Sequence, residues 1–286
     1  MRKQVLFILS LFLAINLHAE NKFVIEGRVA NVPDGLIVEL LRNEDNVGML
    51  VASDTLRNGK FRFEEETSGN GTDWMFLTAR TENYYSMILY LWVRPGSSIR
   101  ISADNLLVYT WNVESDVPEQ QTRSKILASS RDLWNEYQIL DGDYDSLRSR
   151  IKSGKYSGEE KKRQKARLDS MKQAKSMLQD RISAVELEAM AKLDVDQAWM
   201  LNYVNTAYMV NISKNKDNLE KAKALYAYIP DVWRDSFSGR EAKNVLFPQH
   251  VVEVGEEAAD ADLYDIDGKL WHLSDFRGRY VLIDFW

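Results

Sequence analysis

The hydrophobic period of this chain changes once along its length, near Pro118. Before that point, apolar residues alternate with polar ones between turns rich in Pro, Gly and Asn, a pattern of short antiparallel strands. After it, apolar residues recur about every three to four positions, as on one side of a helix. The sequence therefore predicts an α+β protein, with an antiparallel β-sandwich over residues 20–117 and a helical region over residues 118–247.

The turn Asn58-Gly59 is the strongest local signal in the β-rich half. It separates two strand-forming runs, 49–56 and 61–63, and both of its residues tolerate the positive φ that gives a two-residue hairpin its twist. Strands are predicted at residues 23–29, 36–41, 49–56, 61–63, 74–80, 85–93 and 98–102. Strands at such short spacing favour two packed sheets.

Helical periodicity predicts helices at residues 119–140, 157–193, 196–212 and 217–228, with a short one near 240–246. Asp196 and Asp217 each stand at an N-cap position, where a carboxylate accepts hydrogen bonds from N–H groups of the first turn. Pro230 is expected to end the fourth helix. The tryptophans of both halves fall on strand faces or helix stripes, which predicts core packing rather than ligand stacking.

A basic run extends from Arg148 to Lys175, where Lys and Arg greatly outnumber the acidic Glu159, Glu160 and Asp169. Two interpretations are open. The run is either a solvated helix face whose acidic partners lie elsewhere on the chain, or a surface that docks an acidic partner.

The first residues have the composition of a secretory signal peptide. Arg2 and Lys3 form a basic start, residues 5–17 are apolar, and Ala19 offers a small residue at a cleavage position. We therefore expect residues 1–19 to be removed and the mature protein to be periplasmic or secreted. The apolar run is too short for a comfortable membrane span, so no stable span is expected after cleavage.

The net charge limits the classes of partner that we expect for this protein, and the cysteine content limits how the fold can be stabilised. The formal net charge is −6, and it becomes −8 without residues 1–19, which contribute the two cations Arg2 and Lys3 and no acidic residue. An acidic protein is a poor ligand for nucleic acid, so no nucleic-acid partner is expected. The chain contains no Cys, so its stability in an oxidising compartment depends on packing rather than on disulfides.

The last stretch, residues 260–286, combines a hairpin signal with a strongly apolar end. Asp267-Gly268 is a tight turn between the runs 263–265 and 270–273. Residues 274–278 are predicted to form a further turn, and residues 280–286 have the composition of a strand covered on both faces. A hairpin and one strand cannot bury both faces alone. We therefore interpret residues 248–286 as a linker and the opening fragment of a larger α/β domain.

The motifs of this stretch resemble the start of a thioredoxin-like domain of the TlpA/ResA type, a family of periplasmic thiol–disulfide oxidoreductases in the AhpC/TSA-redoxin superfamily. The resemblance covers residues 254–261, the hairpin 265–269, the segment 273–279 and residues 281–286. In that family a Cys-x-x-Cys dithiol follows the Phe-Trp pair, which here is the last pair of the sequence. The β-rich half is similar to the N-terminal domain often found ahead of such thioredoxin-like domains.

The resemblance implies a fold and an activity. The parent domain would exchange electrons with thiols and disulfides of exported proteins, with no further cofactor. Asp284 corresponds to a buried aspartate behind the dithiol, whose raised pKa lets it relay a proton to and from the resolving cysteine. The structural alternative for Asp284 is an aspartate at a strand end with no proton to move. Trp286 would flank the dithiol, or simply pack in the core.

Two functional hypotheses follow. In the first, the chain is the N-terminal part of an exported thiol–disulfide oxidoreductase and is inactive alone, because it lacks the dithiol. Its β domain and helices would then position partner proteins or mediate self-association into a homo-oligomer. In the second, the chain is a noncatalytic secreted binding module with a vestigial thioredoxin-like tail.

Two other groups of polar residues near the C-terminus give weaker evidence of a catalytic or metal site. His272, Ser274 and Asp275 are close in sequence, but neighbours on one strand or turn point in different directions, so no catalytic triad is predicted. Asp262 and Asp265 precede the Asp267-Gly268 turn, yet the spacing is not that of a calcium-binding loop, and turn chemistry explains the aspartates better. No metal site is expected.

Overall fold

The computed structural model describes residues 21–44, 47–82, 84–248, 255–257, 260 and 262–283. The chain divides into two compact units, one up to Leu246 and one from Phe247 onward. Each unit is considered by itself. The β-rich half and the helical region both belong to the first unit, and the predicted α+β class is confirmed.

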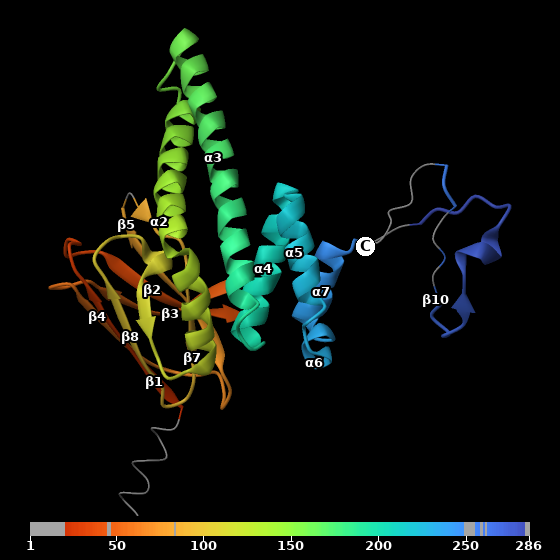
Figure 1. Cartoon of the computed structure of the whole chain (residues 1–286), viewed down its shortest axis with the longest axis horizontal. Helices are drawn as coiled ribbons and strands as arrows, with labels where there is room; N and C mark the ends of the chain where they lie inside the picture. Colours follow the sequence, from red (N-terminus) through yellow and green to blue (C-terminus); the bar gives the residue numbers. More distant parts are fainter. Residues whose placement is uncertain are drawn as a thin grey trace, which may run out of the picture. The chain divides into compact units, whose positions relative to one another are not determined.

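The β-rich half forms two sheets (Figure 1). The first sheet has the strand order β4-β1-β8-β9, with the bounds β4 Lys60–Glu66, β1 Lys22–Val29, β8 Ser98–Ala103 and β9 Asn112–Glu114. The second has the order β3-β2-β5-β6, with β7 also paired to β5, and the bounds β3 Val47–Thr55, β2 Ile37–Glu44, β5 Asp73–Thr81, β6 Tyr84–Tyr85 and β7 Leu89–Val93. The predicted run 85–93 is therefore two strands, and β9 had no counterpart in the prediction.

One strand pair departs from the antiparallel pattern. Strand β1 pairs with β8 in parallel, with Ile25 opposite Ile99 and Gly27 opposite Ile101. The chain between β1 and β8 crosses to the other sheet and returns, which lets both strands run in the same direction. The remaining described pairs are antiparallel.

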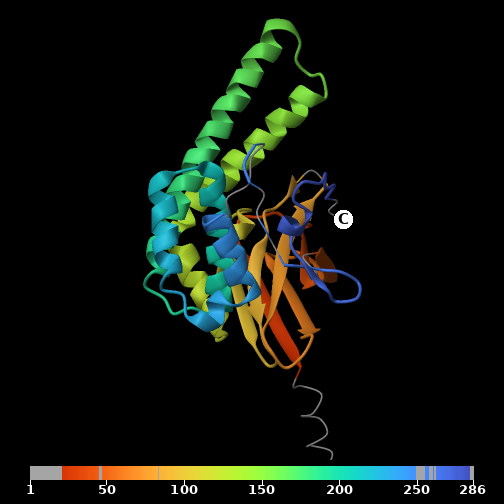
Figure 2. The ribbon, with the colours of Figure 1, turned by 90° about the vertical axis from the view of Figure 1, so that its right-hand side faces the viewer.

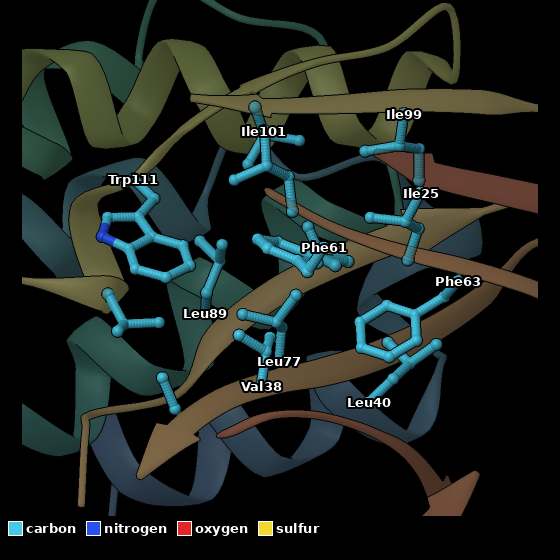
Figure 3. Packing of buried hydrophobic residues seen from close by; sticks show 14 of the residues in the cluster. Ile25, Val38, Leu40, Phe61, Phe63, Leu77, Leu89, Ile99, Ile101 and Trp111 are labelled. Atoms are coloured by element: carbon cyan, nitrogen blue, oxygen red, sulfur yellow. The ribbon is translucent and has the colours of Figure 1, made fainter. Parts of the chain in front are cut away.

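The two sheets bury one shared core, as the alternation predicts (Figure 3). Inward-facing side chains from both sheets have almost no exposed surface, among them Phe23, Ile25, Val38, Leu40 and Leu77. Trp111 and Phe61 contact one another in this core, with ring centroids 6.2 Å apart. Burial of such side chains contributes about 1.5–3 kcal/mol each, and it is the main source of stability for the sandwich.

The hairpin between β3 and β4 has the predicted geometry. Asn58 and Gly59 adopt φ values of 51° and 67°. Arg57 and Lys60 exchange backbone hydrogen bonds of 3.1 and 3.0 Å across the turn. The hydrogen bond from Asn58 N to Asp34 Oδ1, 2.7 Å long, holds the turn against the preceding loop.

The helical region begins with a long helical hairpin, which projects beyond the sandwich (Figure 2). The helices are α2 Pro118–Lys152, α3 Gly158–Met190, α4 Gln197–Ser213, α5 Lys216–Tyr226, α6 Asp231–Arg234 and α7 Phe237–Leu246, and a short 3-10 turn, η1 Val108–Thr110, precedes them. Asp196 caps α4 as predicted, because its side chain accepts a 2.8 Å hydrogen bond from Trp199 N.

Several helix boundaries differ from the prediction by a few residues, and at two helices the contacts explain the difference. Helix α2 continues twelve residues beyond the expected end at position 140, to Lys152. It does so because Leu147 is buried and Asp141 pairs with Lys175 of α3, so contacts with the neighbouring helix replace the apolar stripe. At α5 the N-cap is Asn215, whose side chain accepts from Asn218 N, and Asp217 lies in the first turn instead.

The basic run 148–175 occupies the far end of the α2–α3 hairpin (Figure 1). Part of its charge is matched within the chain, by the pairs Lys162–Glu159, Arg163–Glu160 and Lys175–Asp141. These contacts agree with the interpretation of a solvated helix face. They do not test the other interpretation, an acidic partner.

Helix α2 is fixed to the sandwich at its first turn. Arg94 Nη2 donates to both carboxylate oxygens of Glu119, at 2.7 and 2.9 Å. The next residue, Gln120, accepts a 2.9 Å hydrogen bond from Trp92 N with its side-chain oxygen. Because Gln120 and Trp92 are both buried, this contact ties the helical region to the second sheet.

The unit from Phe247 onward contains a short hairpin and a 3-10 turn. Strand β10, Leu263–Tyr264, pairs with β11, Leu270–Trp271, and η2, Leu273–Phe276, follows. The predicted hairpin is present, but the predicted strand 280–286 is not found in its described part. Residues 280–283 form no strand, and Tyr280 and Leu282 are fully exposed, because no neighbouring strand pairs with them in the described residues.

Candidate functional site

The residues that carry the family resemblance lie in the C-terminal unit. The carboxylate of Asp265 organises the hairpin: its Oδ1 accepts from Asp267 N at 3.0 Å and Lys269 N at 2.9 Å, and its Oδ2 accepts from Trp271 Nε1 at 2.9 Å. The Trp271 bond and these backbone bonds lower the pKa of Asp265. Gly268, with φ of 77°, closes a loop of three residues rather than two. Asp265 therefore serves the turn, as predicted.

A second carboxylate fixes the segment after the hairpin. Asp260 accepts hydrogen bonds from the Ser274 hydroxyl at 2.6 Å and from Leu273 N at 2.7 Å, and these bonds lower its pKa. His272 N donates to Asp275 Oδ2 at 2.8 Å, while its ring nitrogen Nδ1 lies 3.6 Å from Asp262. Ser274 therefore donates to Asp260 rather than to a histidine, and the three neighbouring residues do not form a triad.

The predicted catalytic residue Asp284 and its neighbour Trp286 lie outside the described residues. The proton-relay role of Asp284 therefore stays a prediction. In the described part of the chain, no group of three or more His, Asp or Glu side chains is placed to hold a metal ion. No helix there combines the length and the apolar composition that crossing a bilayer requires.

The first unit contains a cavity of about 480 Å³ between the sandwich and the helices, here named the interface cavity. Strand β7, the turn η1 and helices α2, α3 and α4 all contribute to it. Its wall includes the charged side chains of Arg123 and Glu186 and the apolar or aromatic side chains of Tyr90, Trp134 and Ile212. Mixed linings of this kind are typical of small-molecule sites.

Arg123 is the unusual member of this wall, because it is a buried cation with few partners. Its side chain is 2% exposed. Nη1 donates to Asn202 Oδ1 at 2.9 Å, whereas Nε and Nη2 have no hydrogen-bond acceptor among the described residues. The guanidinium carbon lies 5.1 Å from the centroid of the Tyr109 ring and 5.9 Å from that of Tyr90. These aromatic contacts stabilise the cation, and a side-chain hydrogen bond with Tyr109 also raises the pKa of Arg123.

Glu186 supplies the buried negative charge. Its side chain is 5% exposed, and its Oε1 accepts from the Ser130 hydroxyl and from Trp134 Nε1, each at 2.7 Å. Burial acts to lower the pKa of Arg123, but the charges of Tyr109 and Glu186 outweigh it, so the pKa of Arg123 is raised. Arg123 and Glu186 influence one another through space, without a direct ion pair in the described part of the molecule.

Sequence reasoning missed this cavity, although one signal was available. Arg123 and Ser130 lie on the face of α2 that also carries the buried Leu127 and Tyr137. A charged residue within an apolar helix stripe is costly unless something pairs with it. That stripe marks Arg123 as unusual, but Glu186 and Asn202 belong to other helices, and only the tertiary structure brings the three together.

Six tryptophans of the first unit follow their prediction, whereas Trp271 lies half-exposed in the C-terminal hairpin, where it stacks on Phe276. Trp92, Trp111 and Trp199 are buried in the cores, and Trp74, Trp134 and Trp233 pack against them.

The chain was also compared with known proteins. No family model, no curated protein and no solved structure matched it.

Proposed function

We propose that the chain is the N-terminal part of an exported thiol–disulfide oxidoreductase of the thioredoxin-like type. The observation that carries the proposal is the order of motifs from Asp265 to Trp286, which resembles the opening of a TlpA/ResA-type domain. The hairpin at Asp265–Lys269 and the turn at Leu273–Phe276 support it, because they occur where that resemblance requires a hairpin followed by a turn.

The proposed thiol–disulfide exchange requires a dithiol, and the 286 residues contain no Cys. In this proposal the redox centre is a Cys-x-x-Cys motif encoded shortly after Trp286, with its first thiol at a helix N-terminus that lowers its pKa and makes it the attacking thiolate. The sandwich and helices would position exported partner proteins. The basic start and apolar run of residues 1–19 support export to the periplasm or medium.

Reading the gene tests the proposal. The coding sequence is expected to continue in frame past the codon for Trp286 into a Cys-x-x-Cys motif within a few residues. An in-frame stop codon directly after Trp286 would contradict it.

The 286-residue chain itself is expected to give no insulin reduction by dithiothreitol above the buffer control, because it has no thiol to form the mixed disulfide.

A second candidate function is favoured by one observation, the interface cavity. Small-molecule binding uses a preformed hollow with few, well-placed polar groups, and the first unit has one whose wall includes the buried residues Arg123 and Glu186. The two functions are compatible, since a binding unit can precede a redox domain in one polypeptide.

A further inference from the structure

We infer that Asn70 is a site of spontaneous covalent modification, at which the side-chain amide is lost as ammonia and the residue becomes aspartate or isoaspartate while the chain stays folded. The chain contains two Asn-Gly pairs, Asn58-Gly59 and Asn70-Gly71. Both pairs carry the groups that this reaction needs. The structure holds the first pair in place and leaves the second free to react.

The reaction starts at the backbone nitrogen of Gly71, which loses its proton to water or hydroxide and attacks Cγ of Asn70. The new N–Cγ bond closes a succinimide ring, the Cγ–Nδ2 bond breaks, and Nδ2 takes a proton from solvent and leaves as ammonia. Water then opens the ring. Opening at Cγ gives aspartate, and opening at the main-chain carbonyl carbon gives isoaspartate, whose main chain runs through Cβ. The reaction consumes one water, releases one ammonia and involves no oxidation or reduction.

Asn70 and Gly71 lie exposed in the loop between β4 and β5. Neither residue takes part in a hydrogen bond among the described residues. Nothing lies within 4 Å of the Cβ position of Gly69 or of Gly71, so the space around the pair is open. The absence of a Cβ at Gly71 leaves its nitrogen accessible and its backbone free to turn. The peptide between the two residues can therefore rotate until the nitrogen reaches Cγ.

The loop is held on both sides of the reacting pair. Before it, Thr67 Oγ1 donates to the carbonyl oxygen of Gly69 at 2.8 Å. After it, Arg94 Nε donates to Thr72 Oγ1 at 2.6 Å. The extra main-chain carbon of isoaspartate would fall between these contacts, where the loop packs against nothing within reach of a Cβ. The fold is therefore expected to survive the modification, as exposed loops tolerate local change.

The first pair has the same chemistry in a fixed setting. Asn58 N donates to Asp34 Oδ1 at 2.7 Å, and Val29 N donates to the carbonyl oxygen of Gly59 at 2.8 Å. The two backbone hydrogen bonds across the hairpin turn enclose the pair. Ring closure requires the peptide between Asn58 and Gly59 to rotate, which breaks such bonds. We expect conversion to be roughly tenfold or more slower here than at Asn70, about 1.4 kcal/mol in activation free energy.

The test follows both sites in the unaltered, folded chain during incubation at neutral pH. Cleavage after glutamate places them in separate peptides, 45–64 and 67–82. Mass spectrometry with fragmentation measures the change from amide to acid, and chromatography separates aspartate from isoaspartate. Asn70 is expected to convert roughly tenfold or more faster than Asn58. In concentrated urea the hairpin is lost, so the two rates are expected to become similar, because glycine follows both asparagines.

Two glycine variants identify the attacking nitrogen. Gly71→Ala shields that nitrogen with a methyl group that meets no neighbouring atom, and it is expected to slow conversion of Asn70 by roughly tenfold, about 1.4 kcal/mol in activation free energy. Gly69→Ala is the matched control. It adds a methyl group in equally open space on the other side of Asn70, away from the nucleophile, and should leave the rate nearly unchanged.

Equal rates at Asn58 and Asn70 in the folded chain would overturn the inference, and so would an Asn70 that keeps its amide throughout. A difference between the two sites that persists undiminished in urea would overturn the role given to the hairpin. If Gly69→Ala slows conversion as much as Gly71→Ala does, the nitrogen of Gly71 is not the attacking group.

Discussion

Glycines with positive φ differ in what surrounds them. Gly59 has φ of 67°, and a Cβ at this position would lie 2.6 Å from the carbonyl oxygen of Val29. Gly35 has φ of 97°, but nothing lies within 4 Å of its Cβ position. The backbone oxygen of Val29 cannot move easily, because its residue belongs to β1. Gly59 is therefore required for two reasons: its φ is positive, and a Cβ at its position would collide with the backbone of Val29.

We predict that Gly59→Ala destabilises the chain by roughly 2–3 kcal/mol, because left-handed strain adds to the clash with Val29. Gly35→Ala, the matched control, should cost only about 1 kcal/mol, since it introduces strain without a clash. Urea denaturation of the two variants checks this. Equal losses in the two variants would show that the contact with Val29 is unimportant.

Ionisation of the buried Tyr109 side chain makes the stability of the folded chain depend on pH in the alkaline range. Burial raises the pKa of Tyr109 to about 12. The folded chain therefore keeps the phenol proton between about pH 10 and 12, while the unfolded chain releases it, and stability falls as the pH rises through this window. The contribution is at most roughly 2–3 kcal/mol, the value of a two-unit pKa difference.

We expect Tyr109→Phe to reduce the loss of stability above pH 10 without abolishing it, because one buried phenol no longer titrates while those of Tyr84 and Tyr203 still do. Thermal unfolding at intervals from pH 8 to about 11 measures the slope. The control, Tyr85→Phe, changes an exposed phenol and should leave the slope as it is. A Tyr109→Phe variant with the slope of the unaltered chain would assign the alkaline loss to other groups.

At the scale of elements, most of the local signals worked where the contacts are local, the exception being Asp217, since Asn215 caps α5 instead. The Asn58-Gly59 hairpin, the Asp196 cap and the hairpin near Gly268 are each determined by residues within a few positions, and each occurs where it was predicted. The parallel pairing of β1 with β8 depends on residues more than seventy positions apart, which no local period can encode. The extension of α2 to Lys152 likewise depends on a second helix.

The two candidate sites also differ in whether their residues are neighbours in the sequence or come from separate elements. The motifs that resemble the start of a thioredoxin-like domain were visible in the sequence because they form one continuous stretch. The interface cavity was not, because Arg123, Glu186 and Asn202 come from three helices and Tyr90 from a strand. A polar residue within an apolar stripe is a hint of such a site, but its partner is known only once the helices are placed.

We predict that Asp196→Ala destabilises the chain by about 1 kcal/mol, the usual value of an N-cap, because Trp199 N loses its acceptor. Asp194→Ala, two residues earlier and outside the cap, should change stability by less than about 0.5 kcal/mol. The shift of the urea midpoint compares the two. A larger loss in Asp194→Ala would mean that the cap is elsewhere.

At the scale of the whole molecule, the first unit has its own cores. The described hydrophobic clusters of the sandwich and of the helices draw their buried residues from positions up to Leu246. A unit that buries its own core is expected to fold independently.

We therefore predict that a fragment of residues 21–246 unfolds cooperatively, with a thermal midpoint within about 2 °C of that of residues 21–286. Differential scanning calorimetry of both proteins measures this. A fragment that unfolds more than about 5 °C lower would show that the C-terminal unit stabilises the first.

We propose that this chain belongs to a thiol–disulfide oxidoreductase whose dithiol is encoded after Trp286. The chain has no Cys, so thiol alkylation cannot label it. The most direct measurement is the mass of the natural gene product, captured with an antibody against residues 21–246, reduced and then alkylated. We predict a product longer than residues 20–286 that gains at least two alkyl groups, placed by peptide mapping in one Cys-x-x-Cys peptide. A product that ends at Trp286 and gains none would contradict the claim.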